Sequence, residues 1–165
     1  MKISKKRAYK DYYLFHNTFM DKITRKAQIV VATKSATHQN KFLLLQTNEE
    51  RGSYWQNCTG KVEDDEEFSA GALREVMEET GLSLDNVMDI IDLSLDHHFF
   101  DRWQRNVHEK SYLIIVHEEW SVLIDPQEHG NFKWVEHHHL EAGCVKYPGN
   151  FEALKLASQK LRGLL

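Results

Sequence analysis

Blocks of apolar and polar residues alternate along the chain, and they predict several short buried strands and two amphipathic helices. Apolar runs bounded by polar or turn-forming residues predict strands over residues 28–33, 41–47, 54–56, 86–95, 111–117 and 132–135. The polar link 35–40 predicts a hairpin between the first two. Apolar residues at helical spacing predict one helix that begins near residues 64–67 and ends at Gly81, and another that follows Pro148 and Gly149.

Two stretches mix aromatic and basic residues, and each of them allows two interpretations. Residues 1–22 predict an extension whose aromatic side packs on the domain or on a partner chain, as in a homodimer; alternatively, its tyrosines and lysines cover the substrate entrance. Residues 97–110 lie between two predicted strands. They form either an irregular hairpin whose aromatic rings cap the core, or a substrate wall where a ring stacks on a heterocycle and an arginine meets phosphate.

Length and composition are those of a single globular domain. The chain has 165 residues, of which 41% are hydrophobic and 28% charged, enough for one buried core. No apolar run approaches the ~20 residues that span a membrane, and nothing near the N-terminus resembles a secretory signal, so we expect a cytoplasmic protein. The two cysteines lack metal-type spacing and are expected to be reduced.

Negative charge is concentrated in residues 60–82. This segment carries eight acidic residues against Lys61 and Arg74, whereas the net charge of the whole chain is −4. The rest of the chain is therefore slightly basic and can tolerate a polyanionic substrate. A protein that binds nucleic acids in general would be more basic, so we do not expect a nucleic-acid partner. The exception left open is the 5′ end of an RNA.

Three carboxylates of this segment share one exposed side of the predicted helix, because Glu75, Glu78 and Glu79 fall at i, i+3 and i+4. A solvated acidic face is one explanation. The other is a cation site, since clustered carboxylates repel each other unless a cation lies among them. Hard oxygen ligands suit Mg²⁺, with Mn²⁺ as a substitute, better than zinc. The adjacent histidines 137–139 cannot face one point and predict a solvated helix start instead.

The spacing inside this segment carries a family resemblance. Its sequence is GKVEDDEEFSAGALREVMEETGL: Gly60, five residues, Glu66, seven residues, then REVMEETGL over 74–82. This arrangement resembles the Nudix box at every fixed position. The resemblance implies the α/β Nudix fold, an α/β/α sandwich with a central mixed β-sheet, over residues 23–165. It also implies hydrolysis of a phosphoanhydride.

Box positions also imply roles. Glu75, Glu78 and Glu79 match the metal-binding carboxylates, the Gly60 carbonyl adds a ligand, and Arg74 matches the arginine that orients the glutamates. Glu66 matches a structural glutamate near the helix start. Family members often supply one more carboxylate from a late loop, as metal ligand or base, and Glu128 matches it here. The predicted catalytic set is Glu78, Glu79, Glu128 and Arg74, and the predicted metal ligands are Gly60, Glu75, Glu78, Glu79 and Glu128.

Two further stretches point to a subfamily. YWQNCTGKVE and HHFFDRWQRNVHEKSYLIIV look similar to bacterial dihydroneopterin triphosphate or dNTP pyrophosphohydrolases. That similarity implies a small-molecule triphosphate that loses pyrophosphate and leaves a monophosphate. By position, the predicted substrate contacts are Thr59, His97, His98, Phe99, Phe100, Arg102, Arg105 and Asn150. An arginine that is common after the second strand is Thr47 here.

Other functions stay open within the same resemblance. They are a dinucleoside polyphosphate hydrolase, an RNA 5′-end pyrophosphohydrolase and a Nudix-fold ligand sensor without catalysis. A sensor predicts the loss of box glutamates, and all of them are present. The sequence contains no evident Ser/His/Asp or Cys/His nucleophile arrangement, so we expect direct attack by water. Gly71 and Asp65 replace a common alanine and glycine, and Gly71 is expected to cost the helix under about 1 kcal/mol relative to alanine.

Overall fold

One mixed sheet organises the part of the chain that the computed structural model describes, residues 22–34 and 39–164. Seven strands contribute to it within these ranges: β1 (Thr24–Thr33), β2 (Lys41–Thr47), β3 (Trp55–Gln56), β4 (Cys58–Lys61), β5 (Val87–Phe100), β6 (Asn106–Val116) and β7 (His129–Glu136). Their order is β3-β2-β1-β6-β5, with β4 also paired to β1 and β7 to β2. The β1–β6 pair is parallel and the other pairs are antiparallel.

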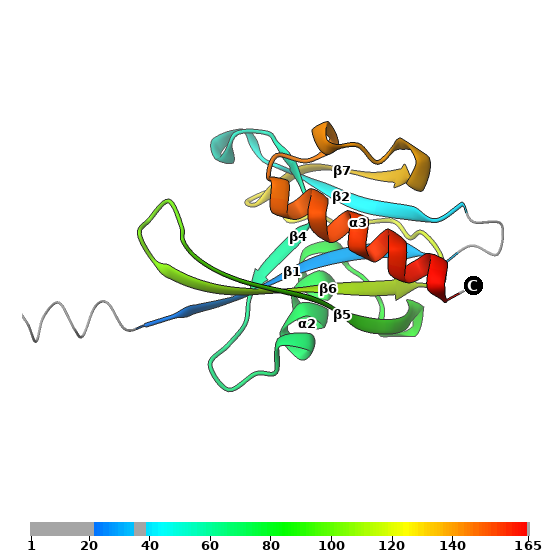
Figure 1. Ribbon diagram of the computed structural model, residues 1–165. Helices are drawn as coiled ribbons and strands as arrows, with labels where there is room; N and C mark the ends of the chain where they lie inside the picture. The colour runs from blue at the N-terminus through cyan, green and yellow to red at the C-terminus, as the bar shows by residue number, and fades with distance from the viewer. Residues whose placement is uncertain (1–21, 35–38, 165) are drawn as a thin grey trace, which may run out of the picture.

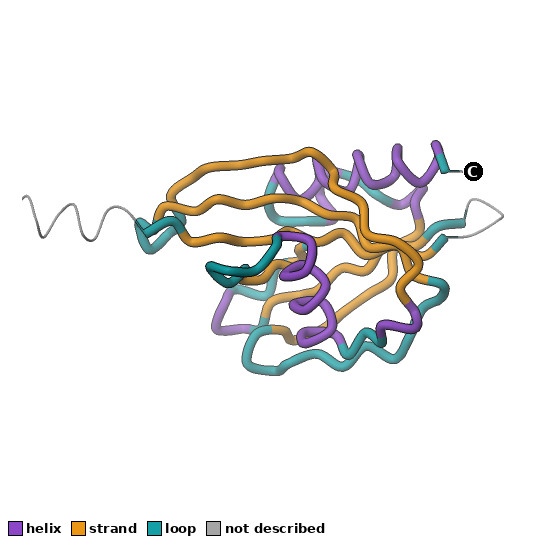
Figure 2. The backbone as a smooth tube through the Cα atoms, turned by 90° about the horizontal axis from the view of Figure 1, so that it is seen from below, coloured by secondary structure: helices purple, strands orange, loops and turns teal. Residues whose placement is uncertain are grey.

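Two α-helices cover opposite faces of this sheet (Figures 1 and 2). They are α2 (Phe68–Thr80) and α3 (Pro148–Gly163), and the short 3-10 turns are η1 (Glu49–Arg51), η2 (Leu84–Asn86), η3 (His137–His139) and η4 (Ala142–Cys144). The predicted α/β/α sandwich is therefore confirmed. Among the described helices, none is both long and apolar enough to cross a membrane. The predicted extension lies outside the described residues except for Lys22, and so does most of the predicted hairpin turn.

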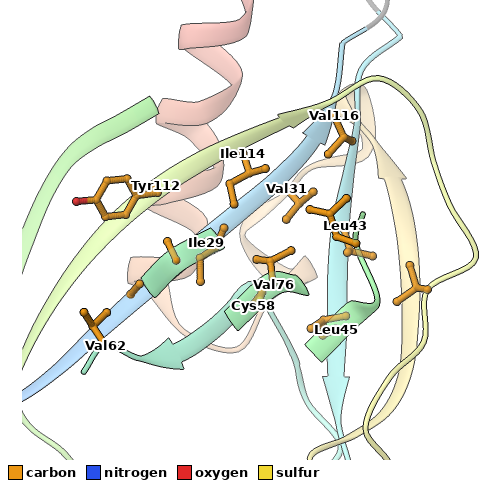
Figure 3. Packing of buried hydrophobic residues seen from close by; sticks show 14 residues of the cluster. Ile29, Val31, Leu43, Leu45, Cys58, Val62, Val76, Tyr112, Ile114 and Val116 are labelled. Atoms are coloured by element: carbon orange, nitrogen blue, oxygen red, sulfur yellow. The ribbon is translucent and has the colours of Figure 1, made fainter. Parts of the chain in front are cut away.

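Strand alternation explains why the sheet needs a helix on each side. On β1, Ile29 and Val31 belong to the core under α2, while Val30 and Ala32 belong to the core under α3. Successive side chains point to opposite faces of a strand, so a continuous apolar run such as QIVVAT must be covered twice. Figure 3 shows the first core, in which Val76 of α2 meets Ile29, Leu43 and other residues of the central strands.

The segment 97–110 forms a hairpin, as one of its two interpretations expected, but its strands are paired regularly and the expected irregularity is wrong. β5 continues to Phe100 and β6 starts at Asn106, so most of these residues are paired, His98 directly with His108. The Asp101 carboxylate closes the turn by accepting bonds from the backbone N–H groups of Trp103 and Arg105. The sequence does not reveal these strands because both of their faces carry polar or exposed residues, so apolar alternation is missing.

The box helix ends where predicted and begins slightly later. Gly81 has the left-handed φ of +69° that favours glycine, and its N–H bonds the Met77 carbonyl. The helix begins at Phe68, and Glu67 at its N-cap makes no side-chain cap bond. Glu66, the structural glutamate of the motif, lies just before the helix and accepts two bonds from Arg74.

Gly71 is required by packing, which corrects its expected cost. A Cβ at this position would lie 2.9 Å from Glu66 Oε2 and 2.9 Å from Val62 Cγ2. Both atoms are held, one by Arg74 and the other in the core, so neither moves away cheaply. The helix-propensity gain of alanine is therefore outweighed by overpacking.

We predict that Gly71→Ala lowers the free energy of unfolding by about 1–3 kcal/mol, the usual cost of overpacking. Urea denaturation measures this change. Gly149→Ala is the matched control, because nothing lies within 4 Å of a Cβ there. An unchanged or raised unfolding free energy in Gly71→Ala would show that the higher helix propensity of alanine outweighs the steric conflict.

Candidate metal centre

Arg74 holds the box together from the middle of α2. Its guanidinium donates to both oxygens of Glu66 at 3.0 and 2.9 Å, to Glu75 Oε1 at 2.8 Å and to Glu78 Oε2 at 3.0 Å. It also donates to the backbone carbonyl of Lys61 at 2.8 Å, which ties the helix to β4. These bonds lower the pKa of the Glu66 carboxyl. One arginine thus fixes three carboxylates, as the motif position implies.

Glu75 lies directly against the backbone of Gly60. A Cβ on Gly60 would come within 2.2 Å of Glu75 Cγ, Cδ and Oε2, so only glycine leaves room for this carboxylate. The Glu75 side chain is 14% exposed. Burial raises the pKa of Glu75, Arg74 opposes the shift, and the charges of Glu79 and Glu78 reinforce it. The carboxylates are therefore crowded at this point, and a cation would relieve their repulsion.

Glu79 is buried, so the prediction of three carboxylates on one exposed strip is wrong for this residue. It is only 9% exposed, whereas Glu78 is exposed. Two buried side chains contact its Oε2: the Cys58 thiol at 3.1 Å and His129 Nε2 at 3.2 Å. The acid follows the buried Val76 by three positions, which places it at the border of the apolar side of the helix.

The structure brings the late-loop carboxylate to the box. Ligand atoms of Glu79, Glu128 and His129 all lie within 4.8 Å of one another. Glu128 precedes β7, and its Oε2 accepts a bond from Arg51 at 3.0 Å. Carboxylate oxygens from two elements and a glycine that leaves space for a third suit a divalent cation. Roles as ligands for Glu75, Glu78, Glu79, Glu128 and the Gly60 carbonyl stay predictions that this geometry fits.

Sequence reasoning missed His129, Cys58 and Arg51. His129 is 2% exposed, and its Nδ1 has no hydrogen-bond partner in the described part of the chain. Its position next to Glu128 and one residue before a glycine was the available signal. Arg51 lies in η1, four residues after Thr47, where an arginine was expected. It supplies a guanidinium beside the candidate centre from a neighbouring turn.

The predicted substrate contacts fall into two groups. Thr59 lies on β4 and Asn150 in the first turn of α3. The others lie on the β5–β6 hairpin, at the end of β5 or in its turn: His97, His98, Phe99, Phe100, Arg102 and Arg105. Asn150 is 8% exposed and bonds Asn57 and Gln28, so it has a structural role, and its contact with substrate stays a prediction. Arg102 and Arg105 both stack on Trp103, at 4.0 and 4.8 Å from its ring centroid.

The histidines 137–139 form the short helix η3, where His138 and His139 are exposed as expected. The expectation that adjacent histidines cannot face one point is wrong for this pair, because ligand atoms of Glu136, His138 and His139 lie within 4.8 Å of one another.

A family model described as "NUDIX domain" matches residues 24–156, most of the chain. Two curated relatives also match. A dihydroneopterin triphosphate diphosphatase of Haemophilus influenzae is 27% identical over 77% of this chain and 82% of its own length. An octanoyltransferase of Myxococcus xanthus is 30% identical over 65% of this chain, but the match spans only 29% of that protein.

Solved structures show the same fold. The dihydroneopterin triphosphate pyrophosphohydrolase of E. coli matches with a TM-score of 0.67 and 21% identity, over 84% of this chain and 99% of the other. A C. elegans Ap4A hydrolase in a binary complex matches with a TM-score of 0.66 and 22% identity, over 86% and 99% of the two chains. At these identities the likeness concerns the fold alone.

Proposed function

This chain belongs to the Nudix family of pyrophosphohydrolases, and we propose that it hydrolyses a nucleoside or pterin triphosphate to pyrophosphate and a monophosphate. The observation that carries the proposal is the intact acidic centre: Arg74 fixes three carboxylates, and Glu128 approaches Glu79 from a distant loop. A ligand sensor would have no need to keep all of these groups.

The side chains divide the work by position. Glu75, Glu78, Glu79 and Glu128, with the Gly60 carbonyl, would hold Mg²⁺ or Mn²⁺. When bound, such a cation neutralises phosphate charge and lowers the pKa of a water molecule. Hydrolysis of the anhydride bond requires both effects. Arg74 keeps Glu75 and Glu78 in place, while His129 and Cys58 hold Glu79. Arg51, which pairs with Glu128, would supply a guanidinium for a phosphate oxygen.

Glu128 is the candidate general base. It is the carboxylate of the group that comes from outside the box helix, and its ion pair with Arg51 at 3.0 Å orients it. A base must be deprotonated and within reach of the water it activates. Because the Glu128 side chain is 39% exposed, water has access to it.

The substrate class rests on the relatives. The H. influenzae protein that matches over most of both chains is named for dihydroneopterin triphosphate, which supports a triphosphate substrate. The C. elegans Ap4A hydrolase has the same fold at a similar TM-score, so a dinucleoside polyphosphate is the second candidate. Both reactions use the same acidic centre and differ in what lies beyond the phosphates.

A hydrolysis panel tests the proposal. With Mg²⁺ or Mn²⁺ present, we expect dihydroneopterin triphosphate or a dNTP to give pyrophosphate as the sole inorganic product, measured by ion chromatography. The panel includes dinucleoside polyphosphates, nucleotide sugars and 5′-triphosphate RNA. A preference of tenfold or more in kcat/KM for a dinucleoside polyphosphate, about 1.4 kcal/mol, would favour the second candidate. No turnover of any of these compounds would contradict both.

A further inference from the structure

The face of the sheet under α3 continues beyond the start of that helix. β1, β5 and β6 extend past the first turn of α3 in both views (Figures 1 and 2). Leu113 of β6 and Val30 of β1 belong to the core that α3 covers. Because side chains alternate along a strand, Glu109 and Lys26, four residues earlier on each strand, lie on the same face. This part of the sheet is not apolar but polar.

Five side chains make up this polar patch: Lys26, Gln28, Asn57, His97 and Glu109. Strand register places Glu109 directly beside Lys26 on one side and His97 on the other. Gln28 donates to Ser111, the next residue of β6 on this face, and accepts bonds from Asn57 at 3.0 Å and Asn150 at 2.7 Å. The patch is therefore a connected set of groups at the N-terminal end of α3.

Three groups of the polar patch lack partners within the described residues. Asn57 is completely buried, and its Oδ1 accepts no hydrogen bond; His97 Nε2 is also buried and unpartnered. The Glu109 carboxylate makes no hydrogen bond or ion pair there either. Burial raises the pKa of Glu109, against the opposing charges of Lys26 and His97. Unpaired buried polar atoms are rare in folded proteins, and several in one place indicate a partner beyond the protein atoms, either water or a ligand.

The polar patch adjoins the candidate metal centre through consecutive residues. Asn57 bonds Gln28 and Asn150 on the α3 side, while the thiol of Cys58 contacts Glu79 on the α2 side. An aromatic pair borders the patch at the start of α3, where the rings of Tyr54 and Tyr147 meet edge to face at 5.5 Å. The patch and the acidic centre thus lie on opposite faces of the sheet and are joined at the consecutive residues Asn57 and Cys58. A substrate that spans both would place its phosphates at the acidic centre and its ring at the patch.

We propose that Glu109 selects the heterocycle of the substrate by accepting two adjacent N–H donors, the edge of a 2-amino-oxopyrimidine ring such as guanine or a pterin. An ionised carboxylate has two acceptor oxygens and no donor, which matches a ring N–H next to an amino group. Adenine presents an acceptor nitrogen beside its amino group and leaves one carboxylate oxygen unpaired. This inference rests on the proposed function, since it names the ring of that substrate.

Paired triphosphates test the inference. dGTP and dITP differ only in the 2-amino group, so their ratio of kcat/KM isolates the second donor. We expect a preference for dGTP of at least about tenfold, the size of one good polar contact in discrimination. Glu109→Gln replaces one acceptor with a donor and should bring the ratio to within about twofold, mainly through a loss on dGTP. Glu118→Gln changes an exposed acid just after the opposite end of β6 and should keep the preference.

Binding of products separates this inference from the hydrolytic one. dGMP and dIMP are titrated calorimetrically into the wild-type protein and the Glu109→Gln variant, so no turnover is required. Tighter binding of dGMP that Glu109→Gln abolishes supports the inference even if neither triphosphate is hydrolysed. Equal affinity of the wild-type protein for both, or an equal loss on both in the variant, overturns it.

Discussion

Replacing Glu79 with glutamine is expected to lower kcat by about a hundredfold or more while the protein stays folded. The change removes one negative charge from the candidate cation site, and a hundredfold corresponds to about 2.7 kcal/mol of transition-state stabilisation. The amide oxygen can still accept the bonds that Cys58 and His129 direct at Oε2, so the buried surroundings are retained. Steady-state kinetics at saturating Mg²⁺ measure the loss.

The matched control for this prediction is Glu67→Gln. Glu67 stands at the start of the same helix, is exposed and makes no side-chain cap bond. It should retain kcat within about twofold, since surface changes away from such contacts have small effects. Circular dichroism and thermal unfolding must show both variants folded. Near-normal turnover of folded Glu79→Gln would remove Glu79 from the catalytic set.

Replacing Gly60 with alanine is expected to disable the centre from the opposite side. The added Cβ would lie 2.2 Å from three atoms of Glu75, so this side chain must leave its position beside Arg74 Nη1. Both the Gly60 carbonyl and Glu75 are predicted ligands, and a displacement of 1 Å at an active site can cost about a hundredfold in rate. We expect a loss of that size in kcat and weaker Mn²⁺ binding.

Mn²⁺ binding followed by electron paramagnetic resonance separates this effect from unfolding. Gly143→Ala serves as control, because no atom lies within 4 Å of a Cβ at that position. The Gly60→Ala protein should also lose about 1–3 kcal/mol of unfolding free energy from overpacking. If Mn²⁺ affinity and kcat both match those of the control, Glu75 is free to move and its placement against Gly60 has no functional meaning.

Much of the fold follows from local patterns. β2 occupies the predicted residues 41–47, and Gly81 ends the box helix as expected. These elements are read easily because each has a single strong local signal: a continuous apolar run, or a glycine in a left-handed conformation. Strands β5 and β6 extend further toward their shared turn than predicted. The prediction missed these parts because they carry polar and aromatic residues on both faces, so the apolar alternation of a half-buried strand is absent.

The candidate site was predictable in part for the same reason. Glu75, Glu78 and Glu79 share one helix, so their spacing brings them together whatever the rest of the chain does. Glu128 comes from a loop some fifty residues away, and only its resemblance to a family pattern pointed to it. The structure places it beside Glu79. His129, Cys58 and Glu109 carry no local signal, because each becomes informative only through its neighbours in space.

The sequence by itself determined the helix that carries the acids, the central strands and the phosphoanhydride chemistry that the box implies. Periodicity and spacing are local properties, and short-range geometry translates them directly into structure. Tertiary structure alone decided that Glu79 is buried against Cys58 and His129, that Gly60 leaves room for Glu75, and that Glu109 lies between Lys26 and His97. Burial and partnership depend on which strands pair, and strand pairing joins residues that are distant in sequence.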